Sequence, residues 1–167
     1  MTSIPADIID WTILNEIIYM DEDDPDFSKS LIIQFIDQAN TTFDSMQEEL
    51  DNNKDLSKLD NLGHFLKGSS ATLGLQRIAW VCERIQNLGR KDENFFPNLN
   101  DLLSTLSEKD SIYLKNLDLS VYSKDITMES THADNEYLLM ITKALNQARI
   151  EFLLARKELS RYYKQEL

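Results

Sequence analysis

The sequence predicts an all-α protein: a four-helix bundle with a short N-terminal helix and an irregular insertion before the long C-terminal helix. Apolar residues recur at spacings of three and four over long stretches, and few windows alternate at period two as strands do. The three prolines lie near expected element boundaries, which leaves long proline-free segments for helices. The 167 residues fit one domain, residues 1–167, since domains commonly have roughly 100–200 residues.

A short first helix is expected over residues 11–20. Asp10 can cap it, because a carboxylate at that position accepts a hydrogen bond from an otherwise unpaired backbone N–H group. Ile13, Leu14 and Ile17 give this helix an apolar surface somewhat wider than a short helix needs. Two outcomes stay open: part of this surface is exposed for a partner, or all of it packs into the core.

A long amphipathic helix is expected over residues 26–51. An acidic turn at residues 21–24 precedes it, and negative charge there stabilises a helix N-terminus through the helix dipole. Pro25 suits the first helical position, where a backbone N–H group is not needed. A docking role for the acidic turn is the weaker alternative.

The next two helices are expected to form an antiparallel hairpin. The first runs over residues 56–73 and ends at Gly74, since glycine readily adopts the left-handed conformation that terminates helices. The second begins almost at once, with an apolar stripe that includes Cys82 as a buried thiol. If the chain reverses near residue 75, residue n lies level with about residue 150 − n, because both helices rise equally per residue.

Residues 92–134 are the least regular part of the chain. We expect residues 95–97 to form an apolar anchor, residues 99–106 a short helix, and the whole segment a partly ordered insertion over one end of the bundle. The final helix shows the clearest periodicity. Over residues 138–162 its apolar residues alternate spacings of three and four across about seven turns, as is typical of a bundle helix.

The stretch from residue 61 to residue 75 holds the most informative polar residues. His64, Lys67 and Gly68 are spaced by three and four, so they share one face of the expected helix. The leucines of this helix form a core-facing stripe on the other side, which leaves His64 facing outward. Gly68 costs about 0.5–1 kcal/mol relative to alanine, which suggests that something must approach the backbone there. The alternative is a solvent-facing histidine beside a tolerated glycine.

Counting along the hairpin adds two residues to the surroundings of His64. Gln86 is expected level with it, and Arg90 lies about one turn further along the same helix. His64 would then have Lys67 on its own helix, and a glutamine and an arginine on the neighbouring one. For Gln86 and Arg90 the alternative is an ordinary solvated helix face.

Several functional classes lack the residues that they need. The net charge of −12 would repel a nucleic-acid backbone, and no apolar run of about 18 residues is present to span a membrane. Residues 63–70 only faintly resemble a phosphate-binding loop, since the lysine precedes the second glycine. Two histidines and one cysteine give no zinc spacing, and Glu129 and His132 supply one Glu-x-x-His element where di-iron bundles need two. We therefore expect no metal site, with His132 in a solvated loop.

The residues around His64 favour a phosphoryl acceptor that has no nucleotide site of its own. A histidine side chain, with an ordinary pKa of about 6.5, is substantially neutral at cytosolic pH, and its neutral nitrogen is a nucleophile. Neighbouring cations would stabilise the oxygens of a transferred phosphoryl group. Gly68 would leave room for the incoming group.

The segment from His64 to Gly74 resembles the signature of histidine-containing phosphotransfer domains. From Ile13 to the final helix, the chain is similar to the fungal subgroup of phosphorelay intermediates in osmosensing pathways. The similarity is specific over residues 60–91 and poor over residues 98–134. It implies a helical bundle in which His64 accepts a phosphoryl group from an aspartyl phosphate of one receiver domain and passes it to an aspartate of another.

By the same resemblance, Lys67 stabilises the phosphate, Gly68 is the small residue beside the histidine, and Gln86 and Arg90 match neighbours found in the fungal subgroup. The implied partners are the receiver domain of a hybrid sensor histidine kinase and the receiver domains of response regulators. The receiver supplies magnesium, so this chain should need no cofactor, and it should have no ATP-dependent kinase activity. We expect a monomer in the cytoplasm and the nucleus.

A receiver-docking surface is expected around His64. Its predicted members lie on the hairpin and on the exposed part of the first helix: Phe65, Ser69, Gln76, Ile13, Leu14 and Ile17. The competing hypothesis is a non-catalytic helical adaptor, for which an acidic surface and exposed hydrophobic residues of the first helix would suffice. A metal-dependent enzyme built on a helical bundle is a third class, which the small number of ligands argues against.

Overall fold

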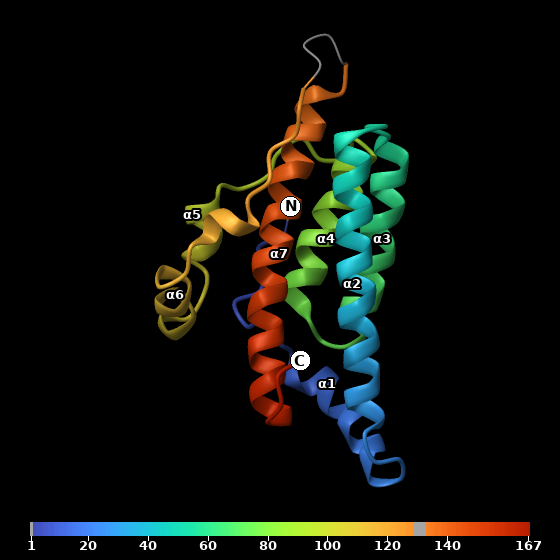
Figure 1. The fold of residues 1–167 in the computed structure, drawn as a ribbon, viewed down its shortest axis with the longest axis vertical. Coiled ribbons are helices and arrows are strands. Elements are labelled where there is room, and N and C mark those ends of the chain that lie inside the picture. Colours follow the sequence, from blue (N-terminus) through green and yellow to red (C-terminus); the bar gives the residue numbers. More distant parts are fainter. Residues whose placement is uncertain (1, 129–132) are drawn as a thin grey trace.

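The computed structural model describes residues 2–128 and 133–167, and within them the regular elements are all helical. Two short 3₁₀ segments accompany the α-helices, η1 after α1 and η2 before α7 (Figure 1). Their bounds are α1 Trp11–Ile18, η1 Tyr19–Glu22, α2 Phe27–Asp51, α3 Leu56–Thr72, α4 Gln76–Gly89, α5 Leu99–Leu103, α6 Glu108–Lys115, η2 Leu119–Tyr122 and α7 Asn135–Tyr163.

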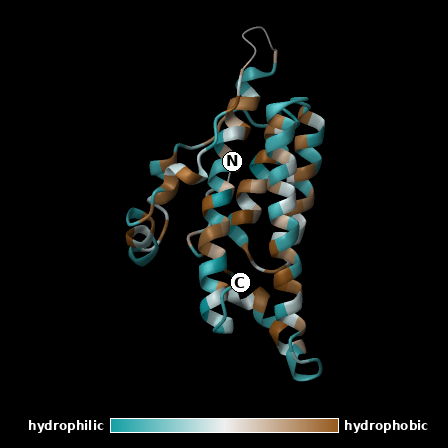
Figure 2. Cartoon of the chain, in the orientation of Figure 1, coloured by the Kyte–Doolittle hydropathy of each residue, from teal (hydrophilic) through white to brown (hydrophobic). Residues whose placement is uncertain are grey.

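Helices α2, α3, α4 and α7 run up and down beside one another and form the bundle (Figure 1). Helix α2 packs against α3 and α7, and α4 packs against the same two helices from the opposite side. Their apolar faces turn inward (Figure 2), so Met46, Leu66, Ile85 and Leu145 are fully buried at the centre. The predicted all-α four-helix bundle is confirmed. No helix within the described ranges is long and apolar enough to cross a membrane.

Helix α1 closes the end of the bundle where α3 turns into α4 (Figure 1). The Asp10 carboxylate accepts from the Thr12 backbone N–H at 3.0 Å, which confirms the predicted cap. The Asp10 backbone N–H donates to the Gly74 carbonyl at 2.8 Å, and Gly74 has the positive φ of 78° expected at a helix end. Leu14 is fully buried in this contact, whereas Ile13 is 37% exposed, so the apolar surface of α1 is divided between core and solvent.

The start of α2 differs from the prediction. Pro25 lies two residues before the helix. Asp26 is the N-cap residue, but it has the left-handed conformation and its side chain accepts no capping hydrogen bond. The cap comes instead from Asp21, whose carboxylate accepts from the Ser28 backbone N–H at 2.7 Å and from its hydroxyl at 2.6 Å. The acidic turn therefore stabilises this N-terminus through one carboxylate that the 3₁₀ segment η1 brings back to it.

The segment between α4 and α7 is more regular than predicted. It contains α5, α6 and η2, and these three elements lie beside α7 and away from the ends of the bundle (Figure 1). Both α-helices have side-chain caps, because Asn98 accepts from the Asp101 backbone N–H and Ser107 from that of Asp110. Phe96 is buried, while Phe95 is 57% exposed, so only one of the two predicted aromatic anchors reaches the core.

One buried arginine ties this segment to the bundle. Arg77 on α4 donates from Nε to both carboxylate oxygens of Glu151 on α7, at 2.8 and 3.0 Å, and both side chains are fully buried. Its Nη1 donates to the Pro5 carbonyl and to the Thr105 hydroxyl, each at 2.8 Å. Arg77 thus connects the N-terminal segment, α4, α7 and the region after α5 through hydrogen bonds to a charged group, which are stronger than neutral ones.

Candidate functional site

Two glycines bring the backbones of α3 and α4 into contact and so build the site. A Cβ atom at Gly63 would lie 2.9 Å from both the Cys82 carbonyl oxygen and the Gln86 backbone nitrogen. A Cβ atom at Gly89 would lie 2.8 Å from the Leu56 carbonyl oxygen. Neither position has room for a larger residue, so the pair fixes the spacing and register of the hairpin.

His64 lies exposed on α3, with its neighbours on α4 at the positions that the counting predicts. Its Nδ1 atom is 3.4 Å from the side-chain amide of Gln86, which is itself buried. Arg90 is one turn further along α4 and donates from Nε to the Asp60 carboxylate at 3.0 Å. The predicted proximity of Gln86 and Arg90 is confirmed, and their roles in a reaction stay predictions.

Lys67 and Gly68 leave the face around His64 open. The Lys67 ammonium group makes no ion pair or hydrogen bond with any residue that the structure describes, so its charge is available to a ligand. Apart from the neighbouring backbone of α3 itself, a Cβ atom at Gly68 would have no atom within 4 Å. The absence of a side chain at Gly68 is therefore not explained by packing within this chain, which agrees with the prediction that a partner approaches here.

Four of the six predicted docking residues are accessible on α1 and α3. Phe65 is 49% exposed beside His64, and Ile17 and Ser69 line a cavity of about 300 Å³ between α1, α2 and α3. Ile13 is exposed on α1. These four residues form an accessible surface on α1 and α3, and Ile17 and Ser69 face α2 across the cavity.

The other two predicted docking residues, Leu14 and Gln76, are less accessible. Leu14 has no exposed area, because it packs beneath α1 into the core. Gln76 is half-buried at the hairpin turn, two residues after Gly74, against which Ile13 packs, and its docking role stays a prediction. Its amide donates to the Asp7 carbonyl at 2.8 Å and so holds the N-terminal segment.

Asp60 was not predicted to lie at the site, although the sequence contains a pattern that predicts its ion pair with Arg90. Asp60 and Arg90 satisfy the same relation that pairs His64 with Gln86, since their numbers also sum to about 150. Opposite charges at level positions on neighbouring antiparallel helices predict an ion pair. Gly63 and Gly89 were missed as well, because the counting was applied to polar residues alone.

The remaining sequence predictions concern Cys82, metal binding and the segment around His132. Cys82 is fully buried, and burial raises the pKa of its thiol from 9.0 to about 12, so the prediction of a structural thiol is confirmed. Residues 2–128 and 133–167 contain no group of three or more His, Cys, Asp or Glu side chains that could hold a metal ion. Glu129 and His132 lie outside the described residues.

Comparison with known proteins identifies the family. A family model described as "Hpt domain" matches residues 30–109, from the first turn of α2 to the start of α6. The chain is 63% identical over 167 residues to "Phosphorelay intermediate protein YPD1" of Saccharomyces cerevisiae, and the alignment covers 100% of both chains. The chain belongs to the Hpt domain family.

Solved structures of this family have the same fold. The crystal structure of yeast Ypd1p superimposes with a TM-score of 0.94 at 59% sequence identity, covering 99% of this Hpt chain and 100% of that chain. A co-crystal structure of Saccharomyces cerevisiae Ypd1 with the receiver domain of its downstream response regulator Ssk1 gives a TM-score of 0.86 at 61% identity, with coverage of 99% and 100%. The resemblance predicted from the His64 to Gly74 segment is confirmed. The family model ends at residue 109, whereas the alignment with the yeast relative runs over the whole chain.

Proposed function

We propose that this Hpt protein is a phosphorelay intermediate of a two-component pathway. His64 accepts a phosphoryl group from an aspartyl phosphate of one receiver domain and transfers it to an aspartate of a response regulator. The observation that carries the proposal is the open face around His64. The Lys67 ammonium, one turn away, pairs with no described residue, and Gly68 beside it is unobstructed. Family membership and the relatives' role in phosphorelay support the same conclusion.

The geometry favours Nε2 of His64 as the reacting atom. Nδ1 faces the Gln86 amide, whereas Nε2 has no hydrogen-bond partner among the described residues. In the tautomer that carries its proton on Nδ1, the Nε2 lone pair attacks phosphorus and the bond from phosphorus to the aspartyl oxygen breaks. The electron pair of that bond stays with the partner's carboxylate, and Lys67 stabilises the phosphoryl oxygens during transfer.

The proposed partners are receiver domains, as in the co-crystal of the yeast relative with a response-regulator receiver. The surface formed by Ile13, Ile17, Phe65 and Ser69 is the proposed docking site, since exposed apolar residues next to a reactive group are suited to a transient protein contact. The receiver supplies the magnesium ion in this scheme. The chain then needs neither a cofactor nor an ATP site, and it serves kinase receivers in the cytoplasm and regulator receivers in the nucleus.

A transfer assay tests the proposal. A receiver domain carrying a labelled aspartyl phosphate is mixed with the wild-type chain and with His64→Gln. The wild type should acquire label in an acid-labile, base-stable linkage, as expected of phosphohistidine, and His64→Gln should acquire none. Label that persists in His64→Gln would remove His64 as the acceptor.

Lys67→Ala separates transfer from binding, and Lys58→Ala is its matched control. Both lysines are on α3, but Lys58 lies six residues before His64 on another face of the helix. Lys67→Ala should slow transfer at least about tenfold, since removing a hydrogen-bond donor that stabilises the transition state typically has an effect of that size or more. Lys58→Ala should transfer at the wild-type rate. Receiver binding without any transfer, unaffected by changes at His64 and Lys67, would support the adaptor hypothesis instead.

A further inference from the structure

Arg90 restricts how the Gln86 amide can be oriented. A guanidinium group carries only N–H donors, so the amide oxygen must be the end that faces it. In that orientation the oxygen accepts from Arg90 Nη1 at 3.0 Å and from Nη2 at 3.1 Å. The opposite orientation would place amide N–H groups against guanidinium N–H groups and satisfy neither.

The orientation of Gln86 in turn restricts the proton on His64. When the amide oxygen faces Arg90, the amide NH₂ group is the end that lies 3.4 Å from His64 Nδ1. Nδ1 must then accept the hydrogen bond through its lone pair, and a neutral imidazole carries its single proton on Nε2. The nitrogen that reacts in the proposed function is the protonated one in this arrangement, and its lone pair is not available.

Asp60 holds Arg90 in the position that produces this effect. Its Oδ1 atom accepts from Arg90 Nε at 3.0 Å, which leaves Nη1 and Nη2 directed at Gln86. The Asp60 side chain is 17% exposed, and the close approach of Gly89 fixes its backbone against α4. The Arg90 side chain is 46% exposed, so a partner can reach it from solvent.

We propose that Asp60 is a positioning residue that acts through Arg90 and Gln86 to bias neutral His64 toward the tautomer protonated on Nε2. An anionic group on a docked partner, such as an aspartyl phosphate, competes with Gln86 for the Arg90 guanidinium. Once Arg90 turns away, the amide can rotate and accept from Nδ1–H, and exchange with water moves the ring proton from Nε2 to Nδ1 with no change in charge. The tautomer bias stands on the geometry alone; its use in gating transfer rests on the proposed function.

Nitrogen NMR of the imidazole ring tests the bias without any phosphoryl transfer. All proteins carry His132→Gln, so that one ¹⁵N-labelled histidine remains, and spectra are recorded at about pH 8, where a typical imidazole is neutral. The parent protein should show Nε2 protonated and Nδ1 unprotonated. Asp60→Ala and Arg90→Ala should each raise the ratio of Nδ1–H to Nε2–H about threefold to tenfold, the range expected for the loss of one net hydrogen bond.

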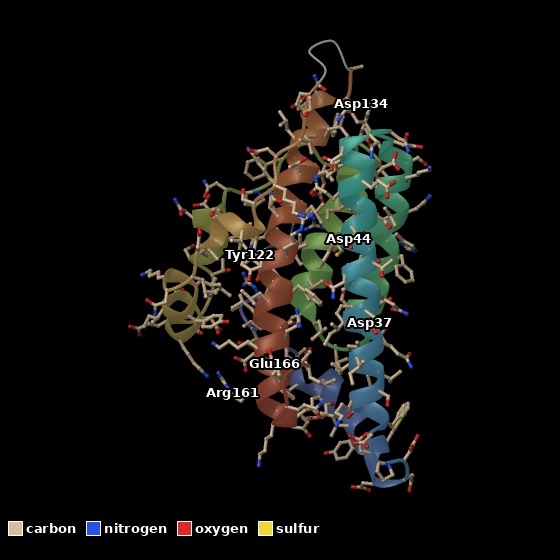
Figure 3. The ribbon with its side chains drawn as sticks, in the orientation of Figure 1. Asp37, Asp44, Tyr122, Asp134, Arg161 and Glu166 are labelled. Carbon is tan, nitrogen blue, oxygen red and sulfur yellow. The ribbon has the colours of Figure 1, made fainter. Side chains whose placement is uncertain are left out.

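Three further variants make the result specific. Gln86→Glu offers only acceptors to the ring and should move the proton to Nδ1, which supplies the reference signal. Asp60→Asn keeps an oxygen that can accept from Arg90 Nε, so its ratio should fall between those of the parent and Asp60→Ala. Asp37→Ala, an exposed carboxylate on α2 (Figure 3), should leave the ratio unchanged.

The outcomes separate this inference from the proposed function. A parent protein with its proton mainly on Nδ1, or an unchanged ratio in both Asp60→Ala and Asp60→Asn, would overturn the inference whether or not the chain transfers phosphate. A protein that shows the expected ratios but fails the transfer assay would leave the tautomer assignment standing and remove the function. Unchanged helical circular dichroism in each variant establishes that the ratios come from folded protein.

Discussion

Alanine substitutions at two glycines of one helix should have opposite effects on stability. Gly63 and Gly68 both lie inside α3, where alanine is favoured over glycine by about 0.5–1 kcal/mol through backbone entropy. At Gly68 nothing lies within 4 Å of the new methyl group, so the full gain should appear. At Gly63 the methyl group would lie 2.9 Å from two backbone atoms of α4, which cannot move like the end of a flexible side chain.

The expected magnitudes follow from these contacts. Overpacking of this kind costs about 1–3 kcal/mol, so Gly63→Ala should be destabilised by a net amount of about 0.5–2 kcal/mol after the helix gain. For a domain of this size, 1 kcal/mol shifts Tm by about 2–4 °C. Gly68→Ala should therefore melt about 1–4 °C above the wild type and Gly63→Ala about 1–8 °C below it.

Urea unfolding followed by circular dichroism measures both variants against the wild type, and equal m values would show that the two-state comparison is valid. The transfer assay supplies the second measurement. Gly68→Ala should transfer more slowly despite its higher stability, because its methyl group occupies space that the partner needs. Destabilisation of Gly68→Ala, or wild-type stability in Gly63→Ala, would refute the steric reasoning about this hairpin.

Two further predictions concern buried groups. Glu151→Ala should destabilise the fold by about 3–5 kcal/mol, because it leaves the buried Arg77 charge uncompensated, whereas Arg77→Met combined with Glu151→Leu should recover most of that loss in thermal melts. For Cys82, the thiol pKa is 9.0 when unfolded and about 12 when folded, so only the unfolded state loses the proton in that interval. The buried protonated thiol therefore contributes fully to the free energy of unfolding below pH 9. Above pH 9 the free energy of unfolding should fall by up to about 1.4 kcal/mol per pH unit toward pH 12. A Cys82→Ala variant, melted in parallel, should lack this pH-dependent loss.

Periodicity alone was sufficient where a helix packs along its whole length. The seam of α7 repeats at three and four residues, so Leu138 to Leu159 could be assigned to the core without knowledge of their partners. The position of Gln86 beside His64 could be predicted as well. It depends only on the rise per residue, which is equal in the two helices, and on the position of the turn in the sequence. Regular geometry is thus what made the candidate site accessible to sequence reasoning.

The errors have a common physical cause, which is contact between residues distant in sequence. Pro25 has the chemistry of a first helical residue, but Asp21 caps α2 from seven residues before Ser28, and local preference does not anticipate that. Whether Leu14 or Ile13 is buried depends on how α1 meets the hairpin turn. The helices of the segment before α7 are short, and they are stabilised by contacts such as that of Thr105 with Arg77, which no local pattern records.

The four-way attachment of Arg77 determines which parts of the molecule can open separately. Releasing the N-terminal segment would remove the Pro5 carbonyl from a guanidinium that has no access to water, so this segment should not fray as chain ends usually do. The amide hydrogen of Asp10, which bonds to the Gly74 carbonyl, should instead exchange together with those of α4 and α7, in one cooperative unit whose opening free energy approaches that of global unfolding. The outer face of α1, which Arg77 does not touch, is left free to adjust locally when another protein binds.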